Sequence, residues 1–269
     1  MAFILRNNDR SPGPDTPGVA RRWVLPPGRL PDDRVTLEVV RLDSGAVMHL
    51  DTSVDELLWF QVLDGQVHAG GEPTGPEFVV MIAGGQRLRI DSPSSATVLV
   101  ARVPHAAEYD PVVRDGLVCR VDWSTEPVLD SEHDSRRRIY LASTGLWGTE
   151  AVKGEMIFYP PGAAGAPHHH EGAEHFQFVL SGTGTALLEG TPVLLEPGDL
   201  LYNLENEVHA FENNGDEDFV FVEFFVPGLS RTVWVPGVNV CTWRPRETDV
   251  HGRPAARTLE AHVHGQGRV

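Results

Sequence analysis

The sequence predicts an all-β protein made of two β-barrels or sandwiches in one chain. From residue 35 onward, short apolar segments that suit β-strands follow one another, with turn signals at intervals of roughly ten residues. The 27 glycines and 21 prolines are the turn residues that many short strands need. The order of segments in the first half also parallels the order in the second half, which indicates an internal repeat.

Five segments are expected along the 269 residues. They are an N-terminal arm (1–34), a first barrel (35–125), an inter-domain connection (126–150), a second barrel (151–228) and a C-terminal extension (229–269). The arm is rich in Pro, Gly and Arg and is expected to add an edge strand to one of the domains. The connection has mixed charge, and its basic triplet at residues 136–138 is interpreted as a solvated face.

The C-terminal extension is expected to pack on a barrel and to end in a frayed terminus. Trp234 and Trp243 favour the packing, because large aromatic side chains are seldom left in water. His251, His262 and His264 have the chemistry of a second metal site. The Gly and Arg residues around them favour a frayed end instead.

Composition narrows the range of partners. The formal net charge is −16, and a nucleic-acid partner is not expected because it would require clustered Lys and Arg. The two cysteines, Cys119 and Cys241, are too few for a disulfide scaffold and indicate a reduced, cytoplasmic setting. The start of the chain lacks the pattern of a secretory signal, and no segment approaches the roughly 20 apolar residues of a membrane-spanning helix. No membrane partner is therefore expected.

The stretch from Gly162 to Asn213 carries the strongest chemical signal. His168 and His170 are two residues apart, so on a strand both side chains leave the same face. His175 opens the next apolar strand, and a third strand brings His209. Because imidazoles are good ligands for Fe, Mn, Ni, Cu and Zn, these four histidines predict a site for one divalent transition metal.

This stretch resembles the cupin family. The first family motif, G-x5-H-x-H-x(3 or 4)-E-x6-G, is matched by Gly162, His168, His170 and Gly182. The second, G-x5-P-x-G-x2-H-x3-N, is matched by Gly198, His209 and Asn213, with Leu204 and Asn206 in place of its proline and second glycine. Asn can adopt the positive φ that this turn requires. The resemblance implies a double-stranded β-helix, or jelly-roll, barrel in residues 151–228.

The family's glutamate ligand has two candidates here. Glu174 has the right spacing from His170 but stands seven residues before Gly182, whereas His175 has an allowed spacing on both sides. Spacing therefore favours His175. The expected ligands are His168, His170, His175 and His209, or three histidines with Glu174 or water.

The first barrel is expected to be a degenerate copy. Gly45, His49 and Asp51 stand where Gly162, His168 and His170 stand in the second half. Residues 82–92 lack the histidine of the second motif. We therefore predict a bicupin whose first barrel binds no metal, with His49 and Asp51 as ordinary barrel residues.

The resemblance implies chemistry at the metal, with Fe(II) favoured and Mn, Ni, Zn or Cu as alternatives. The expected substrate pocket is lined by Met156, Phe158, Gln177 and Phe211, with Tyr202 nearby. The expected proton carriers are Glu174, Tyr202 and Glu207. We predict a non-haem dioxygenase acting on a small carboxylate, keto or phenolic compound. The alternatives are a redox-silent isomerase or epimerase, lyase or hydrolase, and a non-catalytic ligand-binding bicupin. Resemblance to a family that often dimerises also suggests a homodimer.

Overall fold

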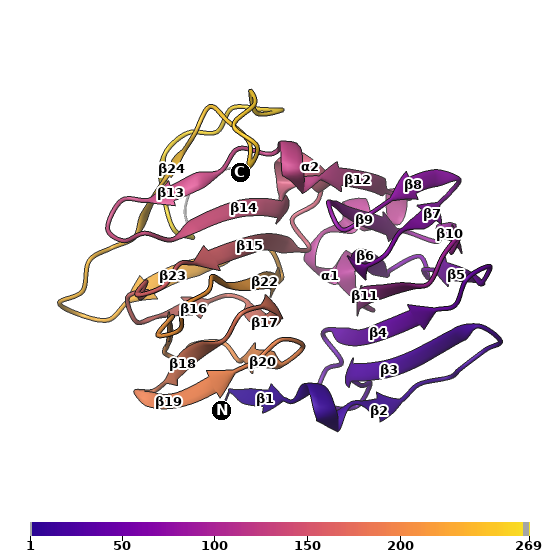
Figure 1. Cartoon of the computed structure of the whole chain (residues 1–269), viewed down its shortest axis with the longest axis horizontal. Helices are drawn as coiled ribbons and strands as arrows, with labels where there is room; N and C mark the ends of the chain where they lie inside the picture. The colour runs from indigo at the N-terminus through magenta and orange to yellow at the C-terminus, as the bar shows by residue number, and fades with distance from the viewer. Residues whose placement is uncertain (1, 266–268) are drawn as a thin grey trace. The chain divides into compact units, whose positions relative to one another are not determined.

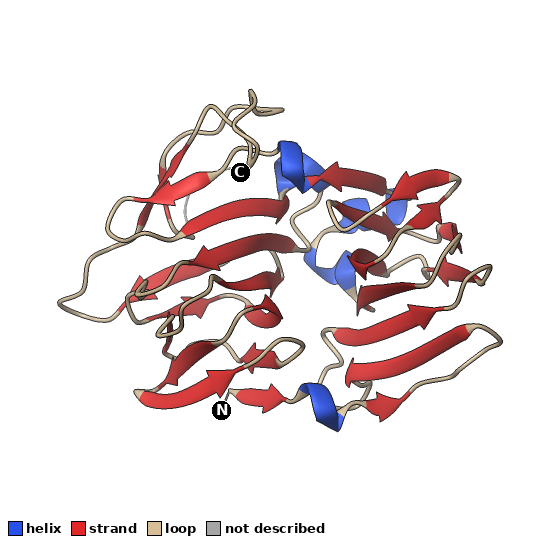
Figure 2. Ribbon diagram, viewed as in Figure 1, coloured by secondary structure: helices blue, strands red, loops and turns tan. Residues whose placement is uncertain are grey.

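The computed structural model describes residues 2–265 and 269 and confirms the all-β prediction. The chain divides into two compact units (Figure 1). The N-terminal unit comprises residues 8–123 and 146–151, and the C-terminal unit comprises residues 1–7, 124–145 and 152–269. Strands make up most of the regular structure in both units, and the helices are short (Figure 2).

The N-terminal unit is built from two antiparallel sheets. Among the described residues, one sheet has the order β12-β9-β6-β11-β4-β3-β2 and the other β5-β10-β7-β8. Their strands are β2 (Ser11–Pro12), β3 (Val19–Leu25), β4 (Thr36–Leu42), β5 (Val47–Asp51), β6 (Leu57–Asp64), β7 (Val67–Ala69), β8 (Glu72–Thr74), β9 (Phe78–Ala83), β10 (Arg87–Asp91), β11 (Ala96–Val103) and β12 (Val118–Asp122). Short helices α1 (Ala106–Tyr109) and α2 (Thr144–Trp147) accompany the strands.

Apolar side chains from both sheets fill the space between them in this unit. Met48, Leu50 and Ile90 come from one sheet, and Leu58 and Phe60 come from the other. On β5 the buried residues are Met48 and Leu50, whereas His49 and Asp51 are exposed. Because side chains alternate along a strand, Met48 and Leu50 point into the core, whereas Val47, His49 and Asp51 point to solvent.

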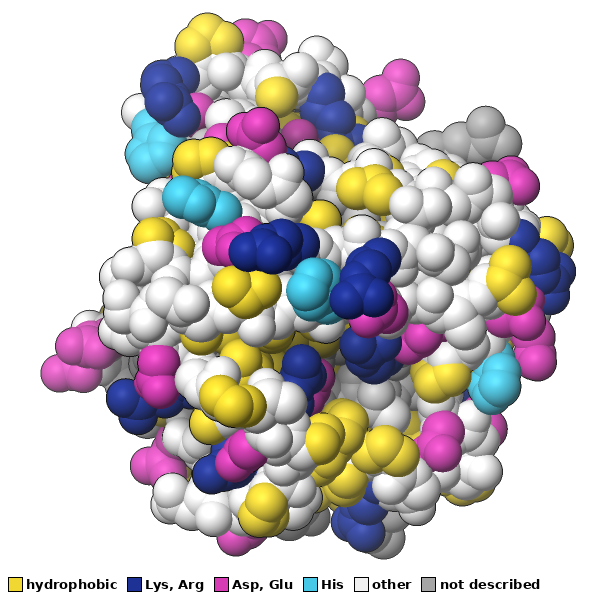
Figure 3. Space-filling model, turned by 90° about the vertical axis from the view of Figure 1, so that its right-hand side faces the viewer, with side chains coloured by type: hydrophobic (Ala, Val, Ile, Leu, Met, Phe, Trp, Pro, Cys, Tyr) yellow, Lys and Arg dark blue, Asp and Glu magenta, His cyan; other side chains and the backbone are white. Residues whose placement is uncertain are grey.

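Charged side chains of both signs are interspersed on the surface. On the face drawn in Figure 3, basic and acidic side chains lie next to one another. In the N-terminal unit, exposed pairs include Arg89 with Asp91 and Arg114 with Asp55. Within the described residues, no helix has the length and apolar character that crossing a membrane requires.

The C-terminal unit also has two antiparallel sheets. Its described residues form one sheet with the order β1-β20-β17-β22-β15-β14-β13-β24-β25 and another with the order β19-β18-β21-β16-β23. The strands are β1 (Phe3–Leu5), β13 (Leu129–Ser131), β14 (Arg137–Ala142), β15 (Lys153–Tyr159), β16 (His168–Glu171), β17 (Glu174–Ser181), β18 (Gly184–Leu188), β19 (Thr191–Leu195), β20 (Leu200–Asn203), β21 (His209–Glu212), β22 (Phe219–Val226), β23 (Arg231–Trp234), β24 (Thr242–Pro245) and β25 (His262–Val263).

Segments outside the expected second barrel extend its larger sheet. Strand β1 of the N-terminal arm pairs with β20, while β2 and β3 of the same arm belong to the other unit. Strands β13 and β14 lie within residues 126–150 and continue the sheet beyond β15. The basic triplet does not form a solvated face: Arg136 and Arg138 are buried, and Arg137 is partly exposed. The period of two in β14 turns Arg136 and Arg138 inward.

The interior of the C-terminal unit has an apolar part and a polar part. Ile157, Phe211 and Phe221 belong to a cluster of buried apolar side chains. On the central strands β15 and β22, Glu155 and Glu223 stand opposite each other and are both buried. Buried carboxyl groups are costly unless they are paired or protonated, so burying these two glutamates lowers stability unless other groups compensate.

The register of β5 is testable by two substitutions at adjacent positions. Leu50→Ala removes a fully buried side chain and should lower the free energy of unfolding by about 2–5 kcal/mol, because it leaves a cavity. His49→Ala changes an exposed side chain and should lie within about 0.5 kcal/mol of the parent protein. Urea unfolding measures both, and equal losses would contradict the assigned register.

Candidate metal centre

Four histidines from three strands converge in the C-terminal unit. His168 and His170 are buried on β16, His175 is buried on β17, and His209 is buried on β21 directly opposite His168. Ring centroids lie 4.6 Å apart for His168 and His209, 4.7 Å for His170 and His175, and 4.7 Å for His175 and His209. His169 lies on the other face of β16, 3.8 Å from Glu171. The strand alternation predicted for these histidines is therefore present.

Hydrogen bonds determine which ring nitrogens can bind a cation. His168 Nδ1 lies 2.8 Å from the Ala166 carbonyl oxygen, and His209 Nδ1 lies 2.9 Å from the Glu207 carbonyl oxygen. Because a carbonyl oxygen only accepts, both Nδ1 atoms carry the proton, and each neutral ring keeps a lone pair on Nε2. His170 Nδ1 contacts the Thr232 hydroxyl at 3.2 Å, and its buried Nε2 has no partner among the described residues.

His175 completes this group. Its Nε2 lies 3.3 Å from His209 Nε2, a separation at which two ring nitrogens can bind the same metal ion. His175, His170 and His209 each place one ring nitrogen within 4.8 Å of the other two. Glu174 lies outside this group, and its carboxylate accepts a hydrogen bond from the Tyr202 hydroxyl at 2.6 Å.

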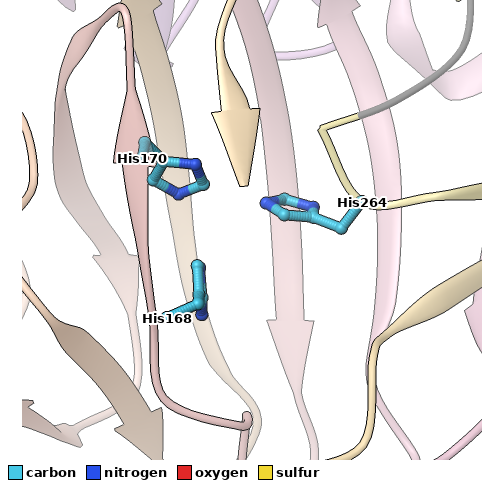
Figure 4. Close-up of side chains that lie close together, drawn as sticks. All are labelled: His168, His170 and His264. Carbon is cyan, nitrogen blue, oxygen red and sulfur yellow. The ribbon is translucent and has the colours of Figure 1, made fainter. Parts of the chain in front are cut away.

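A histidine from the C-terminal extension joins the cluster. His264 is buried, and its ring forms a second group of ligand atoms within 4.8 Å with His168 and His170. Figure 4 shows His264 pointing toward these two residues from a separate segment. The sequence pattern suggested a frayed end here, but residues 262–263 form strand β25 on β24. The two-residue spacing of His262 and His264 was a signal for this strand, but it did not show where the strand would dock.

The turn before β21 is hydrogen-bonded to β16, which carries two of the histidines. Asn206 has a φ of 68°, the positive value expected for the position where the family motif has glycine. Its N–H donates to the His170 carbonyl oxygen at 2.9 Å, which ties the turn to β16. The Asn213 side chain holds two backbone segments together, since it donates to the carbonyl oxygens of Tyr159 and Glu217 at 2.6 and 2.7 Å.

Burial keeps the histidines neutral. It lowers the pKa values of His168, His170 and His175 well below the usual range, and the neighbouring histidines add to the effect. Burial also lowers the pKa of His209, to about 4. Neutral imidazoles with free lone pairs are the form that binds a metal, so the residues present fit a divalent transition metal.

A polar group lies directly beside the histidines. The Glu223 carboxyl lies 3.7 Å from His175 Nε2 and accepts a hydrogen bond from the Gln177 side chain, which in turn accepts one from Asn203 at 2.9 Å. Burial, together with the charge of Glu155, raises the pKa of Glu223 to about 8. This carboxyl group therefore holds its proton to higher pH than an exposed glutamate does. Sequence reasoning missed it because Glu223 interrupts an otherwise apolar strand.

A small cavity of about 20 Å³ adjoins the cluster. It is lined by Arg136, Ile157, Tyr159, His168, Phe211, Phe221, Glu223, Trp234, Cys241, Trp243 and His264. The predicted pocket residue Phe211 is among them. Gln177 is buried beside Glu223, but it does not line the cavity. Ile157 and Tyr159 occupy the places predicted for Met156 and Phe158, because alternation along β15 turns the even-numbered residues to the other face.

The predicted proton carriers lie elsewhere. Tyr202 is stacked on Phe3 of β1 with ring centroids 5.3 Å apart, and its hydroxyl donates to Glu174. The Glu207 carboxylate accepts the Leu204 N–H at 2.8 Å. None of Glu174, Tyr202 and Glu207 lines the cavity. Tyr202 alternates with Asn203 on β20, and it is Asn203 that faces inward, opposite His175.

Comparison with known proteins places this site in a family. Residues 155–225 match the model of the cupin domain. An oxalate-binding protein of Thermotoga maritima is 31% identical over 67 residues, which are 25% of this chain and 55% of that protein. Pectin degradation protein KdgF of Dickeya dadantii is 28% identical over 71 residues, which are 26% of this chain and 64% of that protein. The chain thus covers less than two thirds of each relative's length.

Solved structures extend the likeness to both units. A mutant of oxalate decarboxylase from Bacillus subtilis matches 87% of this chain and 79% of its own, with a TM-score of 0.68 and 16% identity. The structure of that enzyme at pH 4.6 matches 87% and 78%, with a TM-score of 0.67 and 17% identity. At this identity the likeness shows the fold. The fold and the histidine cluster define a two-barrel protein with a site that fits a metal. Residues 155–225 thus match a cupin domain, and the chain has the two-barrel fold of these bicupin structures.

The choice between His175 and Glu174 can be tested directly. His175→Ala should lower metal affinity about 10–100-fold, since it removes a nitrogen that faces His170 and His209. Glu174→Ala should leave metal content unchanged because Glu174 is bonded to Tyr202 instead. Elemental analysis after dialysis against a weak chelator measures both. Equal losses, or a larger loss for Glu174→Ala, would show that the ligand assignment is shifted by one residue.

The depressed pKa values also predict how stability depends on pH in the metal-free protein. The folded protein resists protonation of His209 down to about pH 4, whereas the unfolded chain takes up this proton near pH 6.5. Stability should therefore be complete above pH 6.5 and should fall toward pH 4 by about 1.4 kcal/mol per pH unit for each such histidine. Urea unfolding between these values should show a shallower slope for His209→Leu than for the parent. Identical slopes would contradict the prediction.

Proposed function

We propose that this protein is a metal-dependent enzyme acting on a small carboxylate or keto compound. One observation carries the proposal: ring nitrogens of buried, neutral histidines gather within 4.8 Å of one another, in two groups of three, next to a cavity. In a protein interior such lone pairs are normally satisfied, and here the described residues leave His170 Nε2 without a partner. A bound cation accounts for this arrangement.

The proposed ligands are His168, His170, His175 and His209. All four are neutral, so a divalent metal would keep its full positive charge in a largely apolar interior. An octahedral ion would also have two positions for other ligands. Both features favour a small chelating anion. Fe(II) is the metal we propose. Mn, Ni, Zn and Cu are alternatives, because imidazole ligands suit all of them.

The comparisons support the choice of a carboxylate. Two of the similar proteins are named for oxalate, one for binding it and one for decarboxylating it. The cavity is small and has aromatic walls formed by Phe211, Phe221 and Trp234. A compact acid fits such a space better than a sugar polymer or a nucleotide.

Glu223 favours a redox-silent reaction, in which a proton is moved at the substrate. Its carboxyl group lines the cavity and lies 3.7 Å from His175 Nε2. When bound, a metal would supply the Lewis acid that polarises a substrate carboxylate or carbonyl. Glu223 would then give or take the proton, and Gln177 would hold the carboxyl group in place. This combination supports a lyase or isomerase.

Oxygen-dependent chemistry is the second candidate. The four-histidine donor set favours it, because two open positions would accommodate a substrate oxygen and O2 together. In that reaction no proton carrier is required at the position of Glu223. The two candidates therefore differ in their need for O2 and in their need for Glu223.

An activity screen of small carboxylic and keto acids distinguishes these reactions. A redox-silent reaction should proceed anaerobically, and Glu223→Gln should lower kcat about 10²–10⁴-fold because the amide cannot transfer the proton. Glu174→Gln is the matched control and should retain activity, since Glu174 does not line the cavity. O2 uptake that depends on substrate, with an active Glu223→Gln variant, would support the dioxygenase instead. Anion binding without turnover of any compound would overturn the assignment as an enzyme.

A further inference from the structure

Arg138 holds His264 in one tautomer. Arg138 Nη1 lies 2.7 Å from His264 Nδ1, and both residues are buried. A guanidinium group has no lone pair and can only donate, so His264 Nδ1 must accept. The proton of the His264 ring is therefore on Nε2. This is the opposite tautomer from that of His168 and His209, whose Nδ1 atoms donate to carbonyl oxygens.

The arginine cannot easily turn away to release His264. Its guanidinium donates to the Glu155 carboxylate at 2.5 Å and to the Tyr140 hydroxyl at 2.7 Å, and it lies over the Trp243 ring at 4.3 Å. The hydrogen bond between the sheet and His262 runs in the same direction, from the sheet to the histidine ring. His262 Nδ1 donates to the Glu260 carbonyl oxygen at 2.8 Å, and its Nε2 therefore accepts from the Tyr140 hydroxyl at 2.7 Å. His262 Nε2 and His264 Nδ1 thus both accept hydrogen bonds from side chains of β14.

The backbone at His264 and Gly265 is also held in place by close contacts. The His264 N–H donates to the Cys241 carbonyl oxygen at 3.0 Å. Gly265 follows with a φ of 76°, and a Cβ there would lie 2.3 Å from the hydroxyl oxygen of Thr232. Thr232 itself contacts His170, so the segment passes directly against the histidine cluster. Only glycine fits this close approach.

The remaining nitrogen of His264 faces the cluster. The His264 ring centroid lies 5.6 Å from that of His168 and 5.5 Å from that of His170. His264 and His168 both line the cavity. Figure 4 shows the ring pointing toward the two other histidines. His168 thus offers a lone pair to this space, whereas His264 offers an N–H group.

We propose that His264 is not a metal ligand but a hydrogen-bond donor, delivered by the C-terminal segment, that binds an anionic oxygen of a ligand held at the histidine cluster. The proposal rests on the proposed function for its ligand class, a small carboxylate. A charge-assisted hydrogen bond from a buried N–H is among the stronger ones available to a protein. Arg138 acts as a positioning residue, because it fixes the tautomer through His264 Nδ1.

The tautomer can be read in the metal-free protein, independently of any activity. Long-range ¹H–¹⁵N correlation spectra of the full chain should show His264 protonated on Nε2, and His168 and His209 protonated on Nδ1. The signals that disappear in the variant His264→Gln assign the first of these. A proton on His264 Nδ1 would overturn the proposal.

Metal and anion binding test the role of the N–H group. His264→Leu should retain metal to within about twofold, while His170→Leu should lose about 10–100-fold in metal affinity. Calorimetric titration of metal-loaded protein with oxalate should show affinity about tenfold lower or more for His264→Leu, with His264→Gln between it and the parent, since the amide still donates. His251→Leu removes an exposed histidine of the same extension and should match the parent.

The outcomes separate the two proposals. A parent protein that holds no metal would refute the proposed function, while the spectra would still decide the tautomer of His264. Loss of metal from His264→Leu as large as from His170→Leu would make His264 a ligand and overturn this inference alone. Unchanged oxalate affinity in His264→Leu would do the same. If oxalate and formate both fail to bind to the metal-loaded parent, the anion-binding role is overturned as well.

Discussion

The site depends on the cost of burying lone pairs without partners. A polar atom that loses water and gains no hydrogen bond costs about 1–3 kcal/mol. In the C-terminal unit the Nδ1 atoms of His168 and His209 are bound to carbonyl oxygens, and this leaves the lone pair of each ring on Nε2. The His170 Nε2 atom has no partner within the described chain. Buried polar atoms in folded proteins normally have a partner. A bound cation would be the partner of several ring nitrogens at once.

The two units show how one residue of register separates a site from a core. On β16 the sequence His-His-His-Glu places His168 and His170 inside. On β5 the sequence Val-Met-His-Leu-Asp places Met48 and Leu50 inside, and His49 points to solvent. Matching His49 with His168 by sequence order alone therefore compared residues on opposite faces. The N-terminal interior is then filled by aliphatic side chains, which gives its strands a stable core instead of ligands.

Local sequence predicted the parts of the site that depend on strand periodicity. Alternation on β16 and β17 accounts for the buried positions of His168, His170 and His175. The choice of His175 over Glu174 as a ligand stays a prediction. His264 was beyond such reasoning, since its place depends on β25 docking on β24, more than 50 residues of chain after His209. Arg138 and Glu155 were missed for a related reason. Charged residues usually mark solvated surface, and only their mutual pairing across β14 and β15 permits burial.

The cavity has two walls of opposite hydrogen-bonding character. On one side lies the histidine cluster of β16, β17 and β21, of which His168 lines the cavity, and its ring nitrogens attract a cation. On the other side, His264 presents an N–H group, and Glu223 presents a carboxyl group whose pKa is raised by burial. A cation alone would satisfy the first wall, and an anion alone would satisfy the second. Phe211 and Phe221 narrow the space between them, and this apolar surrounding strengthens both attractions. An interior built in this way is complementary to a metal and an anion bound together.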